Sequence, residues 1–242
     1  MKKTMLALLS LLMILTLSAC GNGGGKEIDK QAYYANFFDT HKIIEEPYVI
    51  STVDELYDSK LEYGVNGDLY YVLLSYGENV LTMYNTDNKA WIDVVMGGED
   101  DGWMCAVIED SEDVAIVGDQ DMLYTVDSTK GVTYKETVKE NGKEYDVLTA
   151  TLIPADEEEE PFEAELWVCK DKVEKIVYDS VGYDEQDNEV ATKTTMLISD
   201  GSKIALPAAA EKASEVDEDT LLWQLIGFIF SDIDFDDFDI EE

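Results

Sequence analysis

The chain has 242 residues and a formal net charge of −37, with 54 acidic residues against 17 lysines and no arginine. Nucleic acids and anionic lipid headgroups are bound by basic surfaces, usually with arginine on phosphate, so this composition excludes nucleic acid as a partner. The length allows one sizeable core or two small ones.

Residues 1–20 have the three parts of an export signal. Lys2 and Lys3 precede an apolar run over 5–17 that is too short to span a bilayer stably. The run ends in Leu17-Ser18-Ala19-Cys20, which resembles the lipobox of bacterial lipoproteins. The resemblance implies cleavage before Cys20, diacylglycerol on its sulfur, and an acylated or exposed new amino terminus. The alternative is an ordinary secretory signal whose cleavage site lies beside a cysteine.

This start defines the first two segments of the chain. Residues 1–19 are predicted to be a lipoprotein signal peptide, and 20–26 a lipidated tether made flexible by glycines. The predicted location is the outer face of the cytoplasmic membrane of a Gram-positive-type bacterium. The protein would then contact the membrane through its lipid anchor.

Residues 26–46 carry apolar side chains at roughly helical spacing and predict one amphipathic helix that ends at Pro47. From Leu61 to Pro207 the period changes to short β-rich segments separated by turn clusters, which is typical of an antiparallel meander. Asn141-Gly142 is the strongest hairpin signal. The predicted strands are 69–75, 80–85, 91–96, 103–108, 114–118, 122–127, 132–139, 144–153, 162–169, 173–180, 191–198 and 203–206.

The sequence offers little catalytic chemistry. His41 is the only histidine, so a histidine-rich metal site cannot be built, and a surface position on the N-terminal helix explains it. No nucleophile-elbow, zinc-protease or phosphate-loop motif is present. We therefore predict no enzyme, no catalytic residue, no cofactor and no metal. Once Cys20 is lipidated, Cys105 and Cys169 can form a disulfide or remain as two small residues in strands.

The order of segments from Tyr134 to Pro207 resembles the C-terminal half of lipoprotein-carrier domains of the LolA and LppX type. The resemblance rests on Glu165-Leu166-Trp167-Val168, the turn Lys170-Asp171-Lys172, the following hairpin and the final Ile204-Ala205-Leu206-Pro207. It implies an α+β fold over 27–207, in which a curved antiparallel half-barrel has a concave apolar face closed by helices. Such domains hold acyl chains or other apolar ligands, or serve as structural modules.

Alternation within two strands indicates which side chains would face such a ligand. In 162–169 and 191–198 one face is apolar and the other mixed, as in a sheet exposed to water on one side. The predicted ligand-binding residues are Phe162, Leu166, Val168, Met196 and Ile198. The leading hypothesis is a non-enzymatic carrier of an apolar ligand held between helix and sheet. The alternatives are an interaction module with a solid core and, third, a secreted hydrolase; for the fold, the alternative is two stacked β-subdomains divided near Gly131.

Residues 208–242 form a C-terminal appendage with an apolar segment and an acidic end. Leu221–Phe230 is predicted to be a helix with Asp219 or Thr220 as its N-cap, ending at about Ser231. The segment is too short to cross a bilayer and must be buried in this domain, in a partner or at a membrane surface. It is therefore a helix docked on the sheet or, alternatively, a plug or recognition segment.

Overall fold

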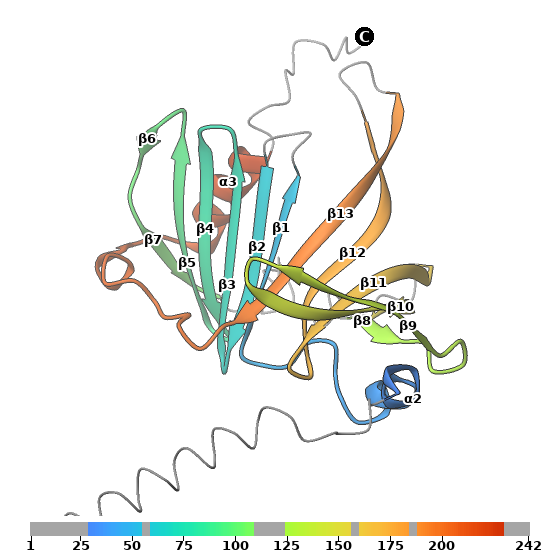
Figure 1. The fold of residues 1–242 in the computed structure, drawn as a ribbon. Helices are drawn as coiled ribbons and strands as arrows, with labels where there is room; N and C mark the ends of the chain where they lie inside the picture. The colour runs from blue at the N-terminus through green and yellow to red at the C-terminus, as the bar shows by residue number, and fades with distance from the viewer. Residues whose placement is uncertain (1–28, 55–58, 109–123, 156–159, 184–187, 230–242) are drawn as a thin grey trace, which may run out of the picture.

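The computed structural model describes residues 29–54, 59–108, 124–155, 160–183 and 188–229 (Figure 1). Fourteen strands form one mixed, mostly antiparallel sheet that does not close, flanked by an N-terminal and a C-terminal helix. The antiparallel sheet and both terminal helices were predicted. The class is mostly β rather than α+β, because the described helices are too short to form a layer of their own.

The strands follow the order β14-β7-β5-β4-β3-β2-β1-β13-β12-β11-β10-β8, with β6 on β5 and β9 on β10. Their bounds are β1 (Tyr48–Asp54), β2 (Ser59–Asn66), β3 (Leu69–Tyr76), β4 (Asn79–Thr86), β5 (Lys89–Met96), β6 (Glu99–Asp100), β7 (Met104–Val107), β8 (Tyr124–Val126), β9 (Val132–Glu140), β10 (Lys143–Pro154), β11 (Phe162–Cys169), β12 (Lys172–Tyr183), β13 (Glu189–Asp200) and β14 (Ser214–Glu215). We call β1–β7 with β14 the N-terminal half and β8–β13 the C-terminal half. They join where β1 pairs with β13.

One face of the sheet, called the inner face here, contains the hydrophobic core. In the N-terminal half a buried row crosses five strands in register: Ile50, Tyr63, Val72, Met83 and Ile92. In the C-terminal half, Leu148, Leu166 and Ile176 form an equivalent row with no exposed surface. Because alternate residues of a strand point to opposite faces, this register keeps the apolar set on one side across both halves.

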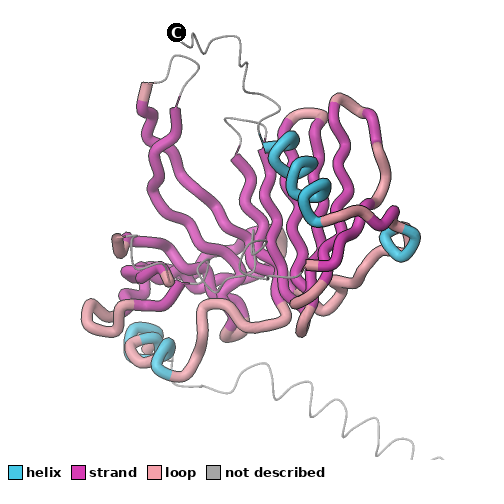
Figure 2. Tube along the Cα trace, turned by 180° about the vertical axis from the view of Figure 1, so that it is seen from behind, coloured by secondary structure: helices cyan, strands magenta, loops and turns pink. Residues whose placement is uncertain are grey.

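The C-terminal helix α3 (Glu218–Ile229) lies on the inner face of the N-terminal half, as Figure 2 shows from behind. Leu221, Leu225 and Phe228 point into the core, which confirms the predicted helix. The predicted N-cap was wrong: the side chain of Asp217 accepts the hydrogen bond from the amide of Thr220 at 2.7 Å. The predicted end at Ser231 lies outside the described residues.

The N-terminal helix is much shorter than predicted. Of the predicted span 26–46, the described residues 29–46 contain the helix α2 (Lys30–Tyr34) and the 3-10 turn η1 (Phe37–Asp39) and no further helix. Tyr34 and Phe37 are buried, and so are Ile43 and Ile44 further along an irregular stretch. The apolar residues thus have the spacing of a helix, but the segment packs along the core as a mixed helix and loop.

Most predicted strands are confirmed, and Phe162–Cys169 has the predicted bounds. Strands β1 and β2 were not predicted, and 114–118 lies outside the described residues. The predicted strand 203–206 was wrong, because the chain leaves the sheet at Gly201 and crosses the opposite, outer face. There a Cβ placed on Gly64 would lie 2.6 Å from the Cδ1 atom of Ile204 and 2.9 Å from the backbone oxygen of Tyr48, so a larger residue would force the crossing to shift. The 3-10 turn η3 (Ala210–Lys212) follows before β14.

Candidate ligand-binding site

The first attachment of helix α2 to the edge strand β9 is made by a glutamine. The side chain of Gln31 donates to the carbonyl oxygen of Val132 at 2.9 Å and accepts from the amide of Tyr134 at 2.8 Å. A primary amide has a donor and an acceptor side by side, so Gln31 pairs with the strand as a neighbouring backbone would. This contact places α2 against one end of the C-terminal half.

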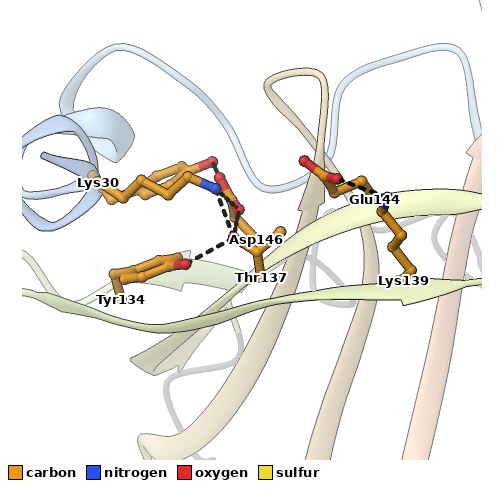
Figure 3. A network of polar contacts seen from close by, with 7 residues as sticks. Lys30, Tyr134, Thr137, Lys139, Glu144 and Asp146 are labelled. Carbon is orange, nitrogen blue, oxygen red and sulfur yellow. Dashed lines mark hydrogen bonds and ion pairs between the residues drawn. The ribbon is translucent and has the colours of Figure 1, made fainter. Parts of the chain in front are cut away.

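The carboxylate of Asp146 is the second attachment (Figure 3). It accepts hydrogen bonds from the Lys30 ammonium at 2.5 Å, the Thr137 hydroxyl at 2.7 Å and the Tyr34 hydroxyl at 2.9 Å. Burial alone would raise the pKa of Asp146, but these three donors outweigh it and hold the pKa below its ordinary value. The same contact raises the pKa of Lys30, so the pair stays ionised.

Beside this network a cavity of about 710 Å³ lies between α2, the β9–β10 hairpin and the β11–β12 turn. The volume is within the range of small-molecule sites in proteins. Its lining combines the aromatic and apolar side chains of Tyr33, Tyr34 and Val168 with charged ones of both signs. The charged residues are Lys30, Lys143, Lys170, Glu144, Asp146, Asp171 and Glu174. The aromatic and apolar part of this lining suits the apolar body of an amphiphile, and an anionic group would have to contact a lysine that no carboxylate pairs.

The β11–β12 turn gives the cavity one of its walls with an unusual backbone. Lys170 and Asp171 have φ values of 50° and 64°, in the left-handed region that normally selects glycine or asparagine. The Tyr33 hydroxyl donates to the carboxylate of Asp171 at 2.8 Å, so the turn also contacts α2. Lysine adopts this conformation at a cost in free energy, and residues in such conformations cluster at functional sites.

The charges around the cavity are only partly paired. Lys30 contacts Asp146, and Lys143 contacts Glu174 at 2.7 Å. Among the described residues Lys170 makes no ion pair and is exposed. Lys170 is therefore the cation available to an anionic group of a ligand.

Two smaller cavities adjoin the same N-terminal segment. One of about 340 Å³ is largely apolar and lies between Phe38, Ile43 and Ile44 on one side and Tyr124 and Val126 of β8 on the other. The second, of about 310 Å³, lies beside Glu46 and Ile198 and shares Asp171 and Glu174 with the large cavity. The N-terminal segment thus lines three cavities in addition to its buried contacts with the core.

The five predicted ligand-binding residues all lie on the inner face. Leu166 and Val168 are buried in the core, whereas Phe162, Met196 and Ile198 are half-buried and pack against it. Of the five, Val168 lines the large cavity and Ile198 the 310 Å³ cavity. Their role in binding stays a prediction.

Sequence reasoning missed the side chains that line the large cavity, above all Lys30, Tyr33, Lys143 and Lys170. The available signal was the pair of turns at Asn141-Gly142 and Lys170-Asp171. These hairpin ends come from β9–β10 and β11–β12, and β10 pairs with β11, so the two turns open at the same end of the sheet.

The remaining candidate residues have structural surroundings. His41 follows η1 rather than lying on a helix; its Nδ1 is 2.9 Å from the Phe37 carbonyl oxygen and its ring stacks on the Phe37 ring. Cys105 and Cys169 are buried free thiols, so the disulfide considered from the sequence is not formed. Within the described part of the chain, no three histidine, cysteine or carboxylate side chains form a group that could hold a metal ion.

Comparison of the sequence with models of known protein families gives no match, and comparison with curated proteins finds no similar one. The architecture therefore defines the protein as one with a large, open, mostly antiparallel sheet. None of the helices in the described ranges has the length and apolar character needed to cross a membrane.

Proposed function

We propose that the protein is a non-enzymatic, lipid-anchored extracytoplasmic binding protein that holds an amphiphilic ligand between α2 and the sheet. The observation that carries this proposal is the 710 Å³ cavity, in which two tyrosines and Val168 lie beside charged side chains and Lys170 has no carboxylate paired with it among the described residues. This position, between the N-terminal helix and the sheet, is the one that the resemblance to lipoprotein-carrier domains predicts. The ligand's apolar part would lie against Tyr33 and Val168, and its anionic group beside Lys170.

The anchor supports the same proposal. Cys20 lies nine positions before Asp29, the residue that caps α2, and such a stretch spans at most about 30 Å. Lipidation at Cys20 would therefore keep the cavity close to the membrane surface, where amphiphiles are concentrated. The lipobox resemblance supports this location.

The binding site is tested with anilinonaphthalene sulfonate, a fluorescent dye with an apolar ring system and an anionic sulfonate. We expect saturable binding that weakens about tenfold in Lys170→Glu and in Tyr33→Ala, because these changes remove the cation and one aromatic wall. Lys193→Glu is the matched control, since Lys193 lies on the exposed part of β13 in a loose ion pair with Asp179. Equal binding by all three variants, or no binding by the wild type, would refute the site.

The anchor is tested separately by fractionating cells that produce Cys20→Ala. We expect this variant in the medium or as unprocessed precursor, because no sulfur is available for acylation. A protein of mature size that stays in the membrane fraction would contradict the lipobox prediction. Native mass spectrometry of the wild-type protein then identifies any amphiphile that copurifies with it.

A further inference from the structure

Helix α3 is apolar on two sides, although only one side contacts the sheet. Leu221, Leu225 and Phe228 are buried with 1%, 2% and 5% exposure. On the other side, Leu222, Ile226 and Ile229 have the i, i+4, i+7 spacing of a second stripe, and Trp223 lies beside Leu222. Leu222, Trp223 and Ile229 are 36%, 70% and 53% exposed. A helix that is apolar all round is normally covered on all sides.

Gly227 lies next to this outward stripe and has no role within the described fold. A Cβ placed on it meets nothing within 4 Å, so neither packing nor backbone conformation requires a glycine there. Glycine inside a helix lowers helix stability relative to alanine. Its missing side chain leaves a flat surface beside Trp223, where another backbone can approach closely.

Negative charge lies at the start of α3 and follows the helix in the sequence, and it determines which partners would be attracted to the stripe. Glu215, Asp217 and Asp219 are exposed at the start of α3, and the helix has no basic residue in its last turn. Residues 230–242 add seven acidic residues and no lysine in sequence. A second copy with a net charge of −37 and an anionic membrane would both be repelled. A protein surface with a basic rim would be attracted.

We propose that the outward stripe of α3, formed by Leu222, Trp223, Ile226, Gly227 and Ile229, docks into an apolar groove rimmed with lysine or arginine on a partner protein. The mode is helix-in-groove recognition, in which side chains at i, i+4 and i+7 anchor one face of a helix. Trp223 is the central anchor, since exposed tryptophans in interfaces contribute disproportionately to binding. This site is separate from the cavity at α2 and does not depend on the proposed ligand.

The test uses two synthetic amphipathic helices with the same leucine face, one completed with lysine and one with glutamate. The purified protein should bind the leucine–lysine helix at least about tenfold more tightly, measured by fluorescence anisotropy. The double variant Leu222→Ser/Ile229→Ser should lose about tenfold in this affinity. The matched control Val181→Ser/Val190→Ser removes exposed valines on β12 and β13 and should bind as the wild type does.

Gly227→Ala separates a binding role from a structural one. Because no atom lies near its Cβ position, we expect a higher Tm together with weaker binding of the leucine–lysine helix. Equal losses in the stripe and control variants would attribute binding to net charge alone and overturn the proposal. Three other results would also overturn the proposal. Self-association that the stripe variant abolishes would make a second copy the partner, and binding to neutral or anionic vesicles would make the membrane the partner. If deletion of 230–242 exposed a previously shielded Trp223 to a quencher, the chain's own C-terminal residues would cover the stripe.

Discussion

The two halves of the sheet bury equivalent apolar rows but stabilise their strands in different ways. In the N-terminal half, Lys60 and Lys89 are the only lysines of strands β1–β7 as the structure describes them, and aromatic rings meet on the outer face. The ring centroids of Tyr71 and Tyr84 are 5.2 Å apart, and those of Tyr84 and Trp103 are 5.9 Å apart. In the C-terminal half, lysines pair with carboxylates across strands: Lys135 with Glu165, Lys143 with Glu174, and Lys175 with Glu140.

This difference follows from the acidic composition. Seventeen lysines cannot neutralise 54 acidic residues, so their placement decides which strands tolerate crowded carboxylates. Strands β9–β12 carry glutamates on their exposed side and have lysines beside them. The N-terminal half instead has few charges within its strands. The 710 Å³ cavity lies in the half where lysines are concentrated, whereas the N-terminal half has a smaller cavity of about 330 Å³ beside β7 and β14.

Two aspartates show the same contrast. Burial raises the pKa of Asp93 on β5, and the nearby Asp100 raises it further. Hydrogen bonds from Lys30, Thr137 and Tyr34 leave the pKa of Asp146 below its ordinary value. One carboxylate therefore opposes folding at neutral pH, whereas the other favours it.

The largest effect on stability is expected from substitutions in the hydrophobic core, to which both halves contribute. Leu225→Ala beneath α3 and Leu166→Ala in β11 should each lower the free energy of unfolding by about 2–5 kcal/mol, because both side chains are fully buried. Leu222→Ala is the control on the same helix and should change it by less than about 0.5 kcal/mol. Guanidinium denaturation measures all three. A small effect of Leu225→Ala would show that α3 rests on the sheet without belonging to its core.

Asp146→Asn should destabilise the protein by about 1–3 kcal/mol at pH 7, because Lys30 loses its ionic partner. The stabilisation by Asp146 exists above the ordinary aspartate pKa and is lost as the pH falls through the lower folded pKa. The wild type should therefore lose more stability than the variant between about pH 5 and pH 2. If the stability of the wild type and of Asp146→Asn changed with pH in parallel, Asp146 would not be the residue that attaches α2.

The substitution Asp93→Asn should have the opposite effect and raise the free energy of unfolding at pH 7 by up to about 1 kcal/mol. The folded pKa of Asp93 lies above its unfolded value, so its cost is present at neutral pH and disappears as the pH falls through the folded pKa. The advantage of the variant should shrink accordingly in acid, as thermal denaturation at a series of pH values would show. A destabilised variant at pH 7 would mean that the ionised carboxylate has a favourable role.

Lys170→Gly should raise stability by about 0.5 kcal/mol, since glycine relieves the left-handed backbone but makes the unfolded chain more flexible. The same change should weaken binding of anilinonaphthalene sulfonate, because the free cation of the cavity is lost. Chemical denaturation measures the change in stability, and titration of the same sample with the dye measures the change in affinity. Unchanged binding would leave the turn without a role in the site.

The smallest effect is expected for the exposed pair of Lys193 and Asp179, whose nearest charged atoms are 3.5 Å apart. Lys193→Ala should change the free energy of unfolding by less than about 0.5 kcal/mol. A larger change would show that exposed ion pairs, and not the buried row, hold β12 and β13 together.

The sequence by itself determined most strands and turns. Alternating side chains in Phe162–Cys169 and the positive φ values at Asn141-Gly142 are local properties, which the pattern of residue types expresses directly. The buried stripe of α3 is equally local. Strand β1 also has β-branched residues, which favour a strand. It was not predicted, because the residues before it have helical spacing and the stretch after it has few turn residues.

Only the tertiary structure decided what these elements meet. Tyr34 and Asp146 are 112 positions apart and form a hydrogen bond because β10 is a neighbour of β9, on which α2 packs. The cavity at α2 and the uncovered side of α3 likewise depend on how elements distant in the sequence pack together. A local pattern specifies which side of an element is apolar, whereas the packing of distant elements decides which apolar sides are covered and where space is left.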